Sequence, residues 1–279
     1  VSAAIYLAGW HRLGQRHSGH LVLPSWRPWC FMGGLTTVWA ALLSPIGVYS
    51  ELFFFMHMIQ HLMLVLVAAP LMLLGAPLLP VLWAFPREAR VELGRLFAPG
   101  PVQLVFGALT QPLVAVTVYC ATLAIWHVPP FYDAAQGRTA VHDLEHALFL
   151  GTALLFWWPA IHPAGGRRRL SYSAGILYFL PPMLVGSLIG ALLTFAERPL
   201  YATYQLVPRV WGISVVQDQQ LAGLIMWVPG GLIFIVPVFV FLALLSRESP
   251  KGEGAAGECL AKGGESIDSG SHMQIPKGR

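Results

Sequence analysis

Six long apolar stretches constrain the fold of this chain more than any other feature. Each is long enough to cross a hydrocarbon core of about 30 Å as a helix rising about 1.5 Å per residue. Membrane-spanning strands are excluded, because they take about ten residues and alternate in polarity. The chain is therefore predicted to be an all-α, polytopic transmembrane bundle. The stretches are 29–48, 52–74 with an extension toward 83, 102–126, 143–161, 171–195 and 220–245.

Composition agrees with a chain that faces lipid. Hydrophobic residues make up 56% of the 279 residues, and Asp, Glu, Lys and Arg only 11%. Soluble domains carry about a quarter of their residues as these charged types, so this chain cannot cover a water-soluble surface. The net charge of +4 comes from short basic clusters between the apolar stretches. These clusters are typical of topology signals, so we expect contact with membrane lipid and none with nucleic acid.

The N-terminus adds a partial helix to this set. The sequence begins at Val1 inside an apolar stretch that is over by Trp10. That stretch is too short to cross a bilayer and lacks the basic start of a signal peptide. We interpret it as the end of a truncated first helix, which raises the expected count to about seven transmembrane helices.

The loops predict the orientation of the bundle. Basic residues gather in every second loop and after the last stretch, whereas the intervening loops are acidic or mixed. Because cytoplasmic loops carry the excess of Lys and Arg, the N-terminus is predicted outside and the C-terminus in the cytoplasm. The basic clusters are Arg12, Arg16 and Arg27; Arg87, Arg90 and Arg95; Arg167, Arg168 and Arg169; and Arg247 with Lys251.

Two regions follow from these patterns. Residues 1–246 are predicted to form the transmembrane bundle. Residues 247–279 are rich in Gly, Ser and charged side chains, and they contain too little apolar surface to order themselves, so a disordered cytoplasmic tail is expected. Within it, the run Gly270-Ser271-His272-Met273 resembles a cloning-vector remnant and is left out of functional reasoning.

The histidines are the strongest functional signal. His57 and His61 are four residues apart near the start of one stretch, and His142 and His146 repeat that spacing at the start of another. A spacing of four puts both imidazoles on one helix face, where they can chelate one metal ion. His127 ends a further stretch. The predicted topology puts all five at one depth near the outer face, so a metal site there is expected.

Further polar and sulfur side chains lie at the same predicted depth. Acidic and amide groups there are candidates to orient ligand imidazoles, and thioethers favour Cu(I). The metal is therefore expected to be copper, as Cu(I). The candidate accessory residues are Met58, Asp133, Glu145, Asp218, Gln219 and Gln220; for Asp218, a helix N-cap is an equal alternative.

Three other uses of these histidines remain open at this point. His142 to His146 match H-x-x-E-H, the inverted zinc motif of metalloproteases, with Glu145 as general base. This motif also needs a downstream carboxylate and a substrate cleft, and it leaves the other pair unexplained. Haem ligation by facing helices is a second alternative, although haem usually takes one His from each of two helices. A redox-inert structural metal is the third.

Several blocks in order along the chain resemble the caa3-type cytochrome c oxidase assembly factor family, CtaG. They are YLAGWHRL, LLSPIGVYSELFFFMHMIQHLMLVLVAAPLMLLG, WHVPPFYDAA, HDLEHALFLGTALLFWWP, LLTFAERPLYATY and DQQLAGLIMWVPGG. Together they run from about residue 3 to about residue 246. The ordered set is specific, although each short block alone is not.

The resemblance implies a seven-helix protein of the bacterial inner membrane that is a metallochaperone or assembly factor and not an enzyme. Such a protein would help to deliver copper to a haem–copper cytochrome c oxidase. Its implied partners are the oxidase subunit that carries the copper site, external copper carriers and a second copy of the chain. The family's motifs fall on the five histidines and on most of the accessory residues above. The main alternative is a copper uptake or resistance protein with the same site.

Overall fold

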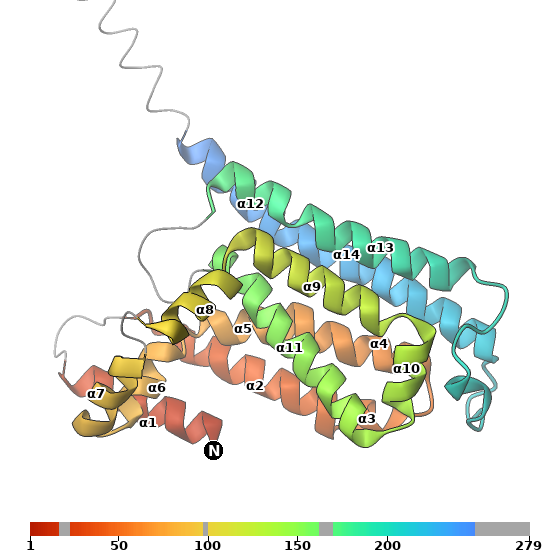
Figure 1. Cartoon of the computed structure of the whole chain (residues 1–279), viewed down its shortest axis with the longest axis horizontal. Coiled ribbons are helices and arrows are strands. Elements are labelled where there is room, and N and C mark those ends of the chain that lie inside the picture. Colours follow the sequence, from red (N-terminus) through yellow and green to blue (C-terminus); the bar gives the residue numbers. More distant parts are fainter. Residues whose placement is uncertain (17–22, 97–99, 162–169, 249–279) are drawn as a thin grey trace, which may run out of the picture.

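The computed structural model describes residues 1–16, 23–96, 100–161 and 170–248, and within them all regular structure is helical (Figure 1). The predicted tail lies almost wholly outside the described residues. The helices are α1 Ser2–Arg16, α2 Arg27–Leu43, α3 Pro45–Ser50, α4 Phe54–Leu62, π-helix η1 Met63–Ala68, α5 Ala69–Leu74, α6 Leu78–Ala84, α7 Arg87–Leu96, α8 Pro101–Leu109, α9 Pro112–Trp126, α10 Pro129–Gln136, α11 Thr139–Ile161, α12 Tyr172–Tyr178, α13 Leu180–Phe195, 3-10 helix η2 Thr203–Gln205 and α14 Val215–Glu248.

Proline and serine explain where many of these helices begin. A proline stands at the first or second position of α2, α3, α8, α9, α10 and α13, where its missing N–H costs no helical hydrogen bond. Ser44 accepts a hydrogen bond from the Ile46 N–H at 3.1 Å and so caps α3. Ser171 caps α12 in the same way through the N–H of Ala174.

Several helices are long and apolar enough to cross a membrane. Four spans meet both criteria among the described residues: Phe54–Leu74, Thr139–Ile161, Tyr172–Phe195 and Val215–Arg247. A fifth forms if α8 and α9, which bend by 68° at the break before Pro112, count as one span. α1 and α2 have 15 and 17 residues and fall short of the same length criterion. The structure therefore supports a multi-pass helical protein, and the count of seven and the orientation stay predictions.

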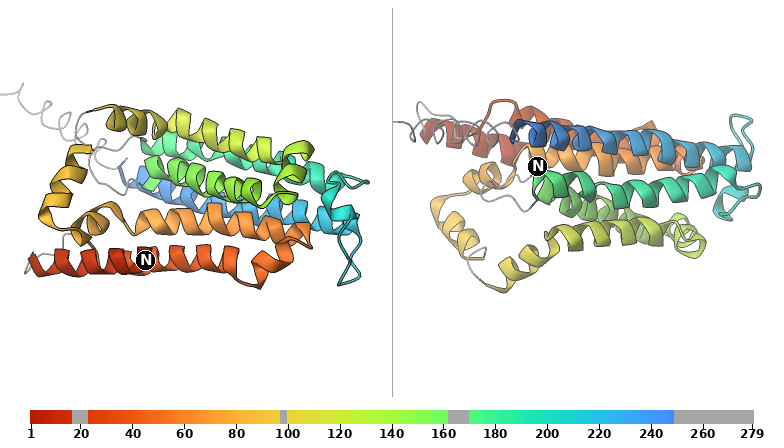
Figure 2. Two further views of the ribbon diagram at one scale, coloured as in Figure 1. Left: turned by 60° about the horizontal axis from the view of Figure 1, so that its bottom comes forward. Right: turned by 90° about the horizontal axis from the view of Figure 1, so that it is seen from above.

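The spans run side by side along the long axis of the molecule (Figures 1 and 2). α13 packs along α14, α9 along α11, and α4 against α14. Gly190 and Gly223 bring α13 and α14 close together, because a Cβ on Gly190 would lie 2.8 Å from the Gly223 carbonyl oxygen. Close approach at small residues is a typical way for transmembrane helices to pack.

A π-helical turn interrupts the span Phe54–Leu74. In this turn the Ala69 N–H donates to the carbonyl of Leu64, five residues back. The same pattern would pair the Val65 carbonyl with residue 70, but residue 70 is proline and has no N–H. The indole N–H of Trp157 on α11 donates to that carbonyl at 2.9 Å instead. A side chain from a neighbouring helix therefore satisfies the backbone of the irregular turn.

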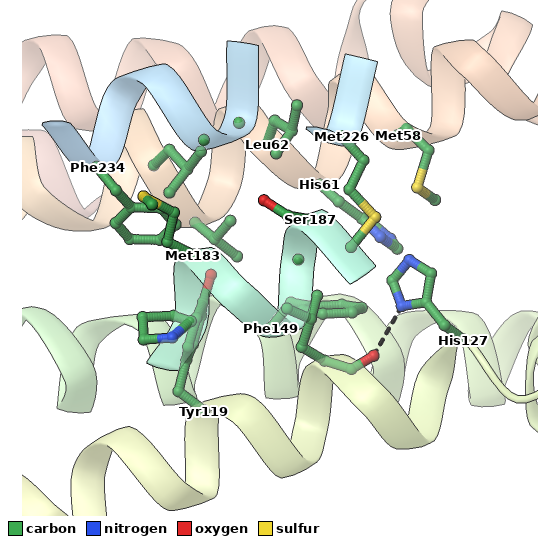
Figure 3. A pocket seen from close by; sticks show the side chains of 17 residues that line it. Met58, His61, Leu62, Tyr119, His127, Phe149, Met183, Ser187, Met226 and Phe234 are labelled. Carbon is green, nitrogen blue, oxygen red and sulfur yellow. Dashed lines mark hydrogen bonds between the residues drawn. The ribbon is translucent and has the colours of Figure 1, made fainter. Parts of the chain in front are cut away.

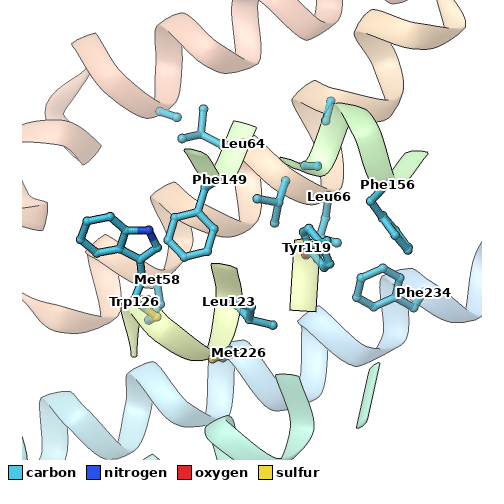
Figure 4. Packing of buried hydrophobic residues seen from close by; sticks show 14 of the residues in the cluster. Met58, Leu64, Leu66, Tyr119, Leu123, Trp126, Phe149, Phe156, Met226 and Phe234 are labelled. Atoms are coloured by element: carbon cyan, nitrogen blue, oxygen red, sulfur yellow. The ribbon is translucent and has the colours of Figure 1, made fainter. Parts of the chain in front are cut away.

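The apolar core extends along the inside of these helices (Figure 4). Phe149 and Phe156 of α11 are almost fully buried, as are Met58 of α4 and Leu64 of η1. Toward one end of the bundle the core meets the starts of α4, α11 and α14, the end of α9, and the short helices α3 and α10 (Figure 1). We call this the histidine end, because both His-x-x-x-His pairs lie there.

Candidate metal centre

The two histidine pairs meet at the histidine end. His57 and His61 project from α4 with ring centroids 4.1 Å apart, and His142 and His146 project from α11 with centroids 4.3 Å apart. Between the helices, the centroids of His57 and His146 are 5.8 Å apart, and those of His61 and His146 are 5.2 Å apart. The four imidazoles therefore form one cluster, as expected from two helical pairs at one depth.

Glu145 adds a carboxylate to this cluster. Its Oε2 lies 3.8 Å from His57 Nε2, and its Oε1 lies 4.0 Å from His61 Nε2. Glu145 and His57 are fully buried, and His61 and His146 are 4% and 6% exposed. Glu145 thus lies among the imidazoles. From sequence we expected it to be an accessory residue that orients the ligands, and the structure puts it near enough to be a candidate ligand itself.

Two overlapping sets of side chains have the spacing of metal ligands. One nitrogen each of His57, His142 and His146 lie within 4.8 Å of one another, and so do one ligand atom each of His57, His61 and Glu145. Ligand atoms about 2.0–2.1 Å from a shared ion are at most about 4 Å apart. Side-chain rotations that bring the atoms closer by less than about 1 Å would therefore let either set coordinate one ion.

Many buried polar atoms of this cluster lack hydrogen-bond partners among the described residues. Buried nitrogen and oxygen atoms are normally paired, because an unpaired one costs about 1–3 kcal/mol. Among the described residues, the buried atoms here that have no partner are His57 Nε2, His61 Nδ1 and Nε2, His127 Nε2, His146 Nε2, and Glu145 Oε1 and Oε2. Imidazole nitrogens and a carboxylate are metal-ligand atoms, so this set of donors fits a cation.

Gln136 of α10 holds His57 from the opposite side. Its amide Nε2 lies 3.3 Å from His57 Nδ1. A half-turn of the amide would present its oxygen there, since the two orientations occupy the same space. That orientation puts the proton on Nδ1 and leaves His57 Nε2 free to bind a cation. Gln136 was not among the residues singled out from sequence.

His127 lies at the edge of the cluster. It follows the last residue of α9, and its Nδ1 is 2.7 Å from the Leu123 carbonyl oxygen. A carbonyl only accepts hydrogen bonds, so Nδ1 carries the proton and Nε2 keeps a free lone pair. His127 is outside both three-residue metal-ligand groupings described above, yet its buried Nε2 faces the cavity that His61 also lines (Figure 3).

Asp218 accepts hydrogen bonds from the backbone at the start of a different helix. Its two carboxylate oxygens accept hydrogen bonds from the N–H groups of Phe54 and Phe55, at 3.0 and 2.9 Å, and Arg209 donates to it at 3.0 Å. The carboxylate thus caps α4, the helix that carries His57. It supports the cluster through the backbone of α4, and in this structure it makes no contact with an imidazole.

The remaining polar candidates hold the segment before α14. Asp133 accepts hydrogen bonds from the Thr203 N–H and hydroxyl, at 3.2 and 2.8 Å. Gln219 accepts from the Leu200 N–H at 2.7 Å, and Gln220 donates to the Ala196 carbonyl at 3.3 Å. These three side chains hold the loop backbone near the cluster in place. The hydrogen bonds that they form go to backbone and to Thr203, and not to the imidazoles.

Three buried tyrosines lie at the histidine end, and sequence reasoning missed them. The Tyr132 and Tyr204 hydroxyls are 2.9 Å apart, Tyr204 donates to the Ser50 carbonyl, and Tyr201 donates to the His127 carbonyl. Burial raises the pKa of all three phenols above the ordinary range, so they stay neutral donors. Their spacing shows no periodicity, and only the fold brings them together.

An open groove leads to the other side of the cluster. It has a volume of about 500 Å³ and is lined by parts of α2, α3, α4, η1 and α11. His142 and His146 line it together with the exposed carboxylates of Glu51 and Asp143. The side-chain oxygen of Gln60, which is buried and has no hydrogen-bond partner, lies in the same wall. A cation could therefore approach the histidines along a path with negative charge at its opening.

Comparison with known proteins decides the family. Residues 4–248 match the family described as cytochrome c oxidase caa3 assembly factor (Caa3_CtaG). The chain belongs to this family. The match covers the whole helical bundle, and the expectation drawn from the ordered sequence blocks is confirmed.

The curated relatives of this caa3 assembly factor family member are longer proteins. An uncharacterized protein of Mycobacterium leprae (strain TN) is 25% identical over 252 residues, which cover 87% of this chain and 37% of the relative. An uncharacterized protein of Mycobacterium tuberculosis (strain CDC 1551 / Oshkosh) is 26% identical over 208 residues, or 73% and 31%. The chain thus spans about a third of the length of these relatives. No solved structure matches it significantly.

Proposed function

We propose that this protein binds copper at the His57–His61–His142–His146 cluster and passes it on during assembly of a haem–copper cytochrome c oxidase. Copper is the cargo in this proposal, so the protein would hold it only until transfer. The family assignment supports a role in oxidase assembly. The recipient would be the oxidase subunit that carries the copper site, and external copper carriers would supply the ion at a bacterial inner membrane.

One observation carries the proposal: buried ligand atoms without hydrogen-bond partners converge from two transmembrane spans. Ionisable groups inside a membrane protein are costly and are usually functional. A cation would pair with the lone pairs of the imidazoles, and the carboxylate of Glu145 would offset its positive charge. A monovalent ion such as Cu(I) and one carboxylate together have no net charge, which limits the cost of burying them.

The ligand types favour copper over the other metals considered. Imidazole binds copper, zinc and iron well, whereas Mg²⁺ and Ca²⁺ prefer sites made of oxygen atoms. A structural zinc site is usually closed and four-coordinate. Here a groove reaches His142 and His146 from one side, so incoming and outgoing ligands have room to exchange. Ligand exchange without a redox step is the chemistry that copper transfer needs.

The proposal is tested by copper competition on the purified full chain. We expect His57→Ala and His146→Ala each to weaken Cu(I) binding at least tenfold, measured anaerobically against a chromogenic Cu(I) chelator. His11→Ala is the matched control, because His11 is exposed on α1, remote from the cluster. The double variant should lose less than the sum of the single losses, since ligands of one ion act as a unit. Unchanged affinity in both single variants would rule out this centre.

A second measurement links binding to assembly. Cells that lack the native protein should regain copper-loaded, active oxidase when they express the wild type or His11→Ala, but not His57→Ala. A copper uptake protein would instead change total cellular copper in step with oxidase activity. Normal oxidase copper in cells that express His57→Ala would contradict a role in delivery.

A further inference from the structure

A second group of ligand atoms lies around a cavity that His61 also lines. A cavity of about 40 Å³ is lined by residues of α4, η1, α9, α11, α13 and α14 (Figure 3). Most of its lining is apolar, and among the described residues no carboxylate, Lys or Arg side chain lines it. The cavity has room for an ion, since one water needs about 10–15 Å³ on the same measure.

Two imidazoles and two buried thioethers line this cavity. His61 and His127 contribute ring nitrogens that are buried and unpartnered. Met58 is 2% exposed and Met226 is 6% exposed. Figure 3 shows the thioether of Met226 directed toward His127 and His61 at one end of the cavity. Met226 comes from α14, and neither the motif pattern nor the histidine spacing pointed to it.

The protonation state of His127 makes it a ligand for this cavity. The hydrogen bond to the Leu123 carbonyl fixes the proton on Nδ1, and the lone pair of Nε2 has no donor to accept from. A backbone carbonyl that orients a ligand imidazole in this way is the usual arrangement at metal sites. A structural histidine whose ring nitrogens are neutral and buried would be expected to pair both of them.

We propose that His127 and Met226 form a second Cu(I) site in this cavity, with Met58 as a further thioether and His61 as the link to the four-histidine centre. Thioether is a soft, uncharged ligand that favours Cu(I), and neutral imidazole binds copper as well. His61 belongs both to the group with His57 and Glu145 and to the cavity lining. Copper could therefore move between the two sites by exchange of one ligand at a time, with no change in oxidation state.

This inference rests on the proposed copper function and divides it into two sites of different chemistry. The outer centre has imidazoles and a carboxylate and opens to the groove. The inner site has imidazole and sulfur in an apolar cavity among the helices. Cu(I) would be held more selectively in the inner site, because nothing there compensates the extra charge of a divalent ion.

The test is anaerobic Cu(I) titration of the full chain combined with X-ray absorption at the copper edge. The wild type should bind two equivalents, with sulfur scattering in the fully loaded protein. Met226→Leu should reduce the sulfur scattering and weaken one equivalent at least tenfold. Met63→Leu is the matched control, because Met63 is partly buried in the span Phe54–Leu74, which also carries Met58, but does not line the cavity. Thermal unfolding of the copper-free variants checks that both fold.

The two proposals fail separately in this experiment. If the loaded wild type shows no sulfur scattering, or if Met226→Leu and Met63→Leu behave alike, the inner site is refuted and the outer centre stands. If His57→Ala with His142→Ala keeps both equivalents, the outer centre is refuted instead. Loss of one equivalent with full sulfur scattering in that double variant supports two distinct sites. If the cavity has no metal role, the His127→Gln variant and the wild type should bind Cu(I) equally, and that result would refute the inner site.

Discussion

Replacing Asp218 tests whether the histidine cluster depends on a cap between two helices. The fully buried carboxylate accepts hydrogen bonds from two N–H groups at the start of α4, and Arg209 donates to it at 3.0 Å. Hydrogen bonds to charged groups contribute about 1.5–3 kcal/mol each, and removing one partner of a buried ion pair costs about 3–5 kcal/mol. The Arg209 side chain is 21% exposed, so water can solvate part of it after the change.

Asp218→Ala is therefore expected to lower the free energy of unfolding by about 3 kcal/mol, the lower end of that range. Asp218→Asn keeps one acceptor oxygen for one of the two N–H groups, so its loss should be about half as large. Both values refer to the copper-free protein, measured by reversible unfolding in mixed detergent micelles. Glu197→Ala is the control, because Glu197 is an exposed carboxylate at the same end of the bundle.

The result that would refute this reasoning is specific. If Asp218→Ala leaves the copper-free protein within about 0.5 kcal/mol of wild type and loses stability only when copper is present, then Asp218 acts at the metal. In that case the hydrogen bonds to α4 would contribute little, and the accessory role considered from sequence would be the correct one.

Three further changes test other parts of the structure. Trp157→Phe removes the donor to the Val65 carbonyl. We expect it to lower the free energy of unfolding in detergent by about 1–3 kcal/mol, which is more than Trp29→Phe should, because Trp29 is exposed. Gly223→Val should separate α13 from α14, because a Cβ there meets the Gly190 carbonyl oxygen at 2.5 Å. An unchanged melting temperature in this variant would refute that contact. Glu145→Gln should weaken copper binding about 10–100-fold by chelator competition, whereas a metalloprotease reading requires a membrane substrate that accumulates uncleaved in cells.

The histidine cluster was the part of the site most open to prediction. His57 with His61, and His142 with His146, each fall on one helix face because of their spacing, and the alternation of basic loops put both pairs at one depth. The helical repeat of 3.6 residues and the alternation of basic loops are local patterns, so both can be recognised directly in the sequence. Whether the cluster binds metal is not decided by its geometry and stays a proposal.

Other parts of the site depend on contacts that no local pattern records. Asp218 lies 164 residues from Phe54, and its partner is the backbone of another helix, so its role as the cap of α4 had no signal in sequence. Gln136 reaches His57 only because α10 folds back over α4. The π-helical turn lies just before Pro70, and Trp157 of another helix donates to its Val65 carbonyl. The short α2 and the bend between α8 and α9 likewise left the number of spans undecided.

The unpartnered atoms of His61 lead to a last prediction about the cost of the site. Both ring nitrogens are buried without a partner, and the ring packs on Phe149 at a centroid distance of 4.4 Å. An unpaired buried polar group costs about 1–3 kcal/mol, and an apolar side chain of similar size avoids that cost. His61→Leu should therefore stabilise the copper-free protein by about that amount while it reduces the stabilisation that copper confers. Ligand sites commonly reduce the stability of the unliganded protein in this way.

The measurement is unfolding with and without Cu(I), with His11→Leu as the exposed control. If His61→Leu destabilises the copper-free protein, the imidazole is already satisfied without a cation, and the argument from unpartnered atoms fails for the whole cluster.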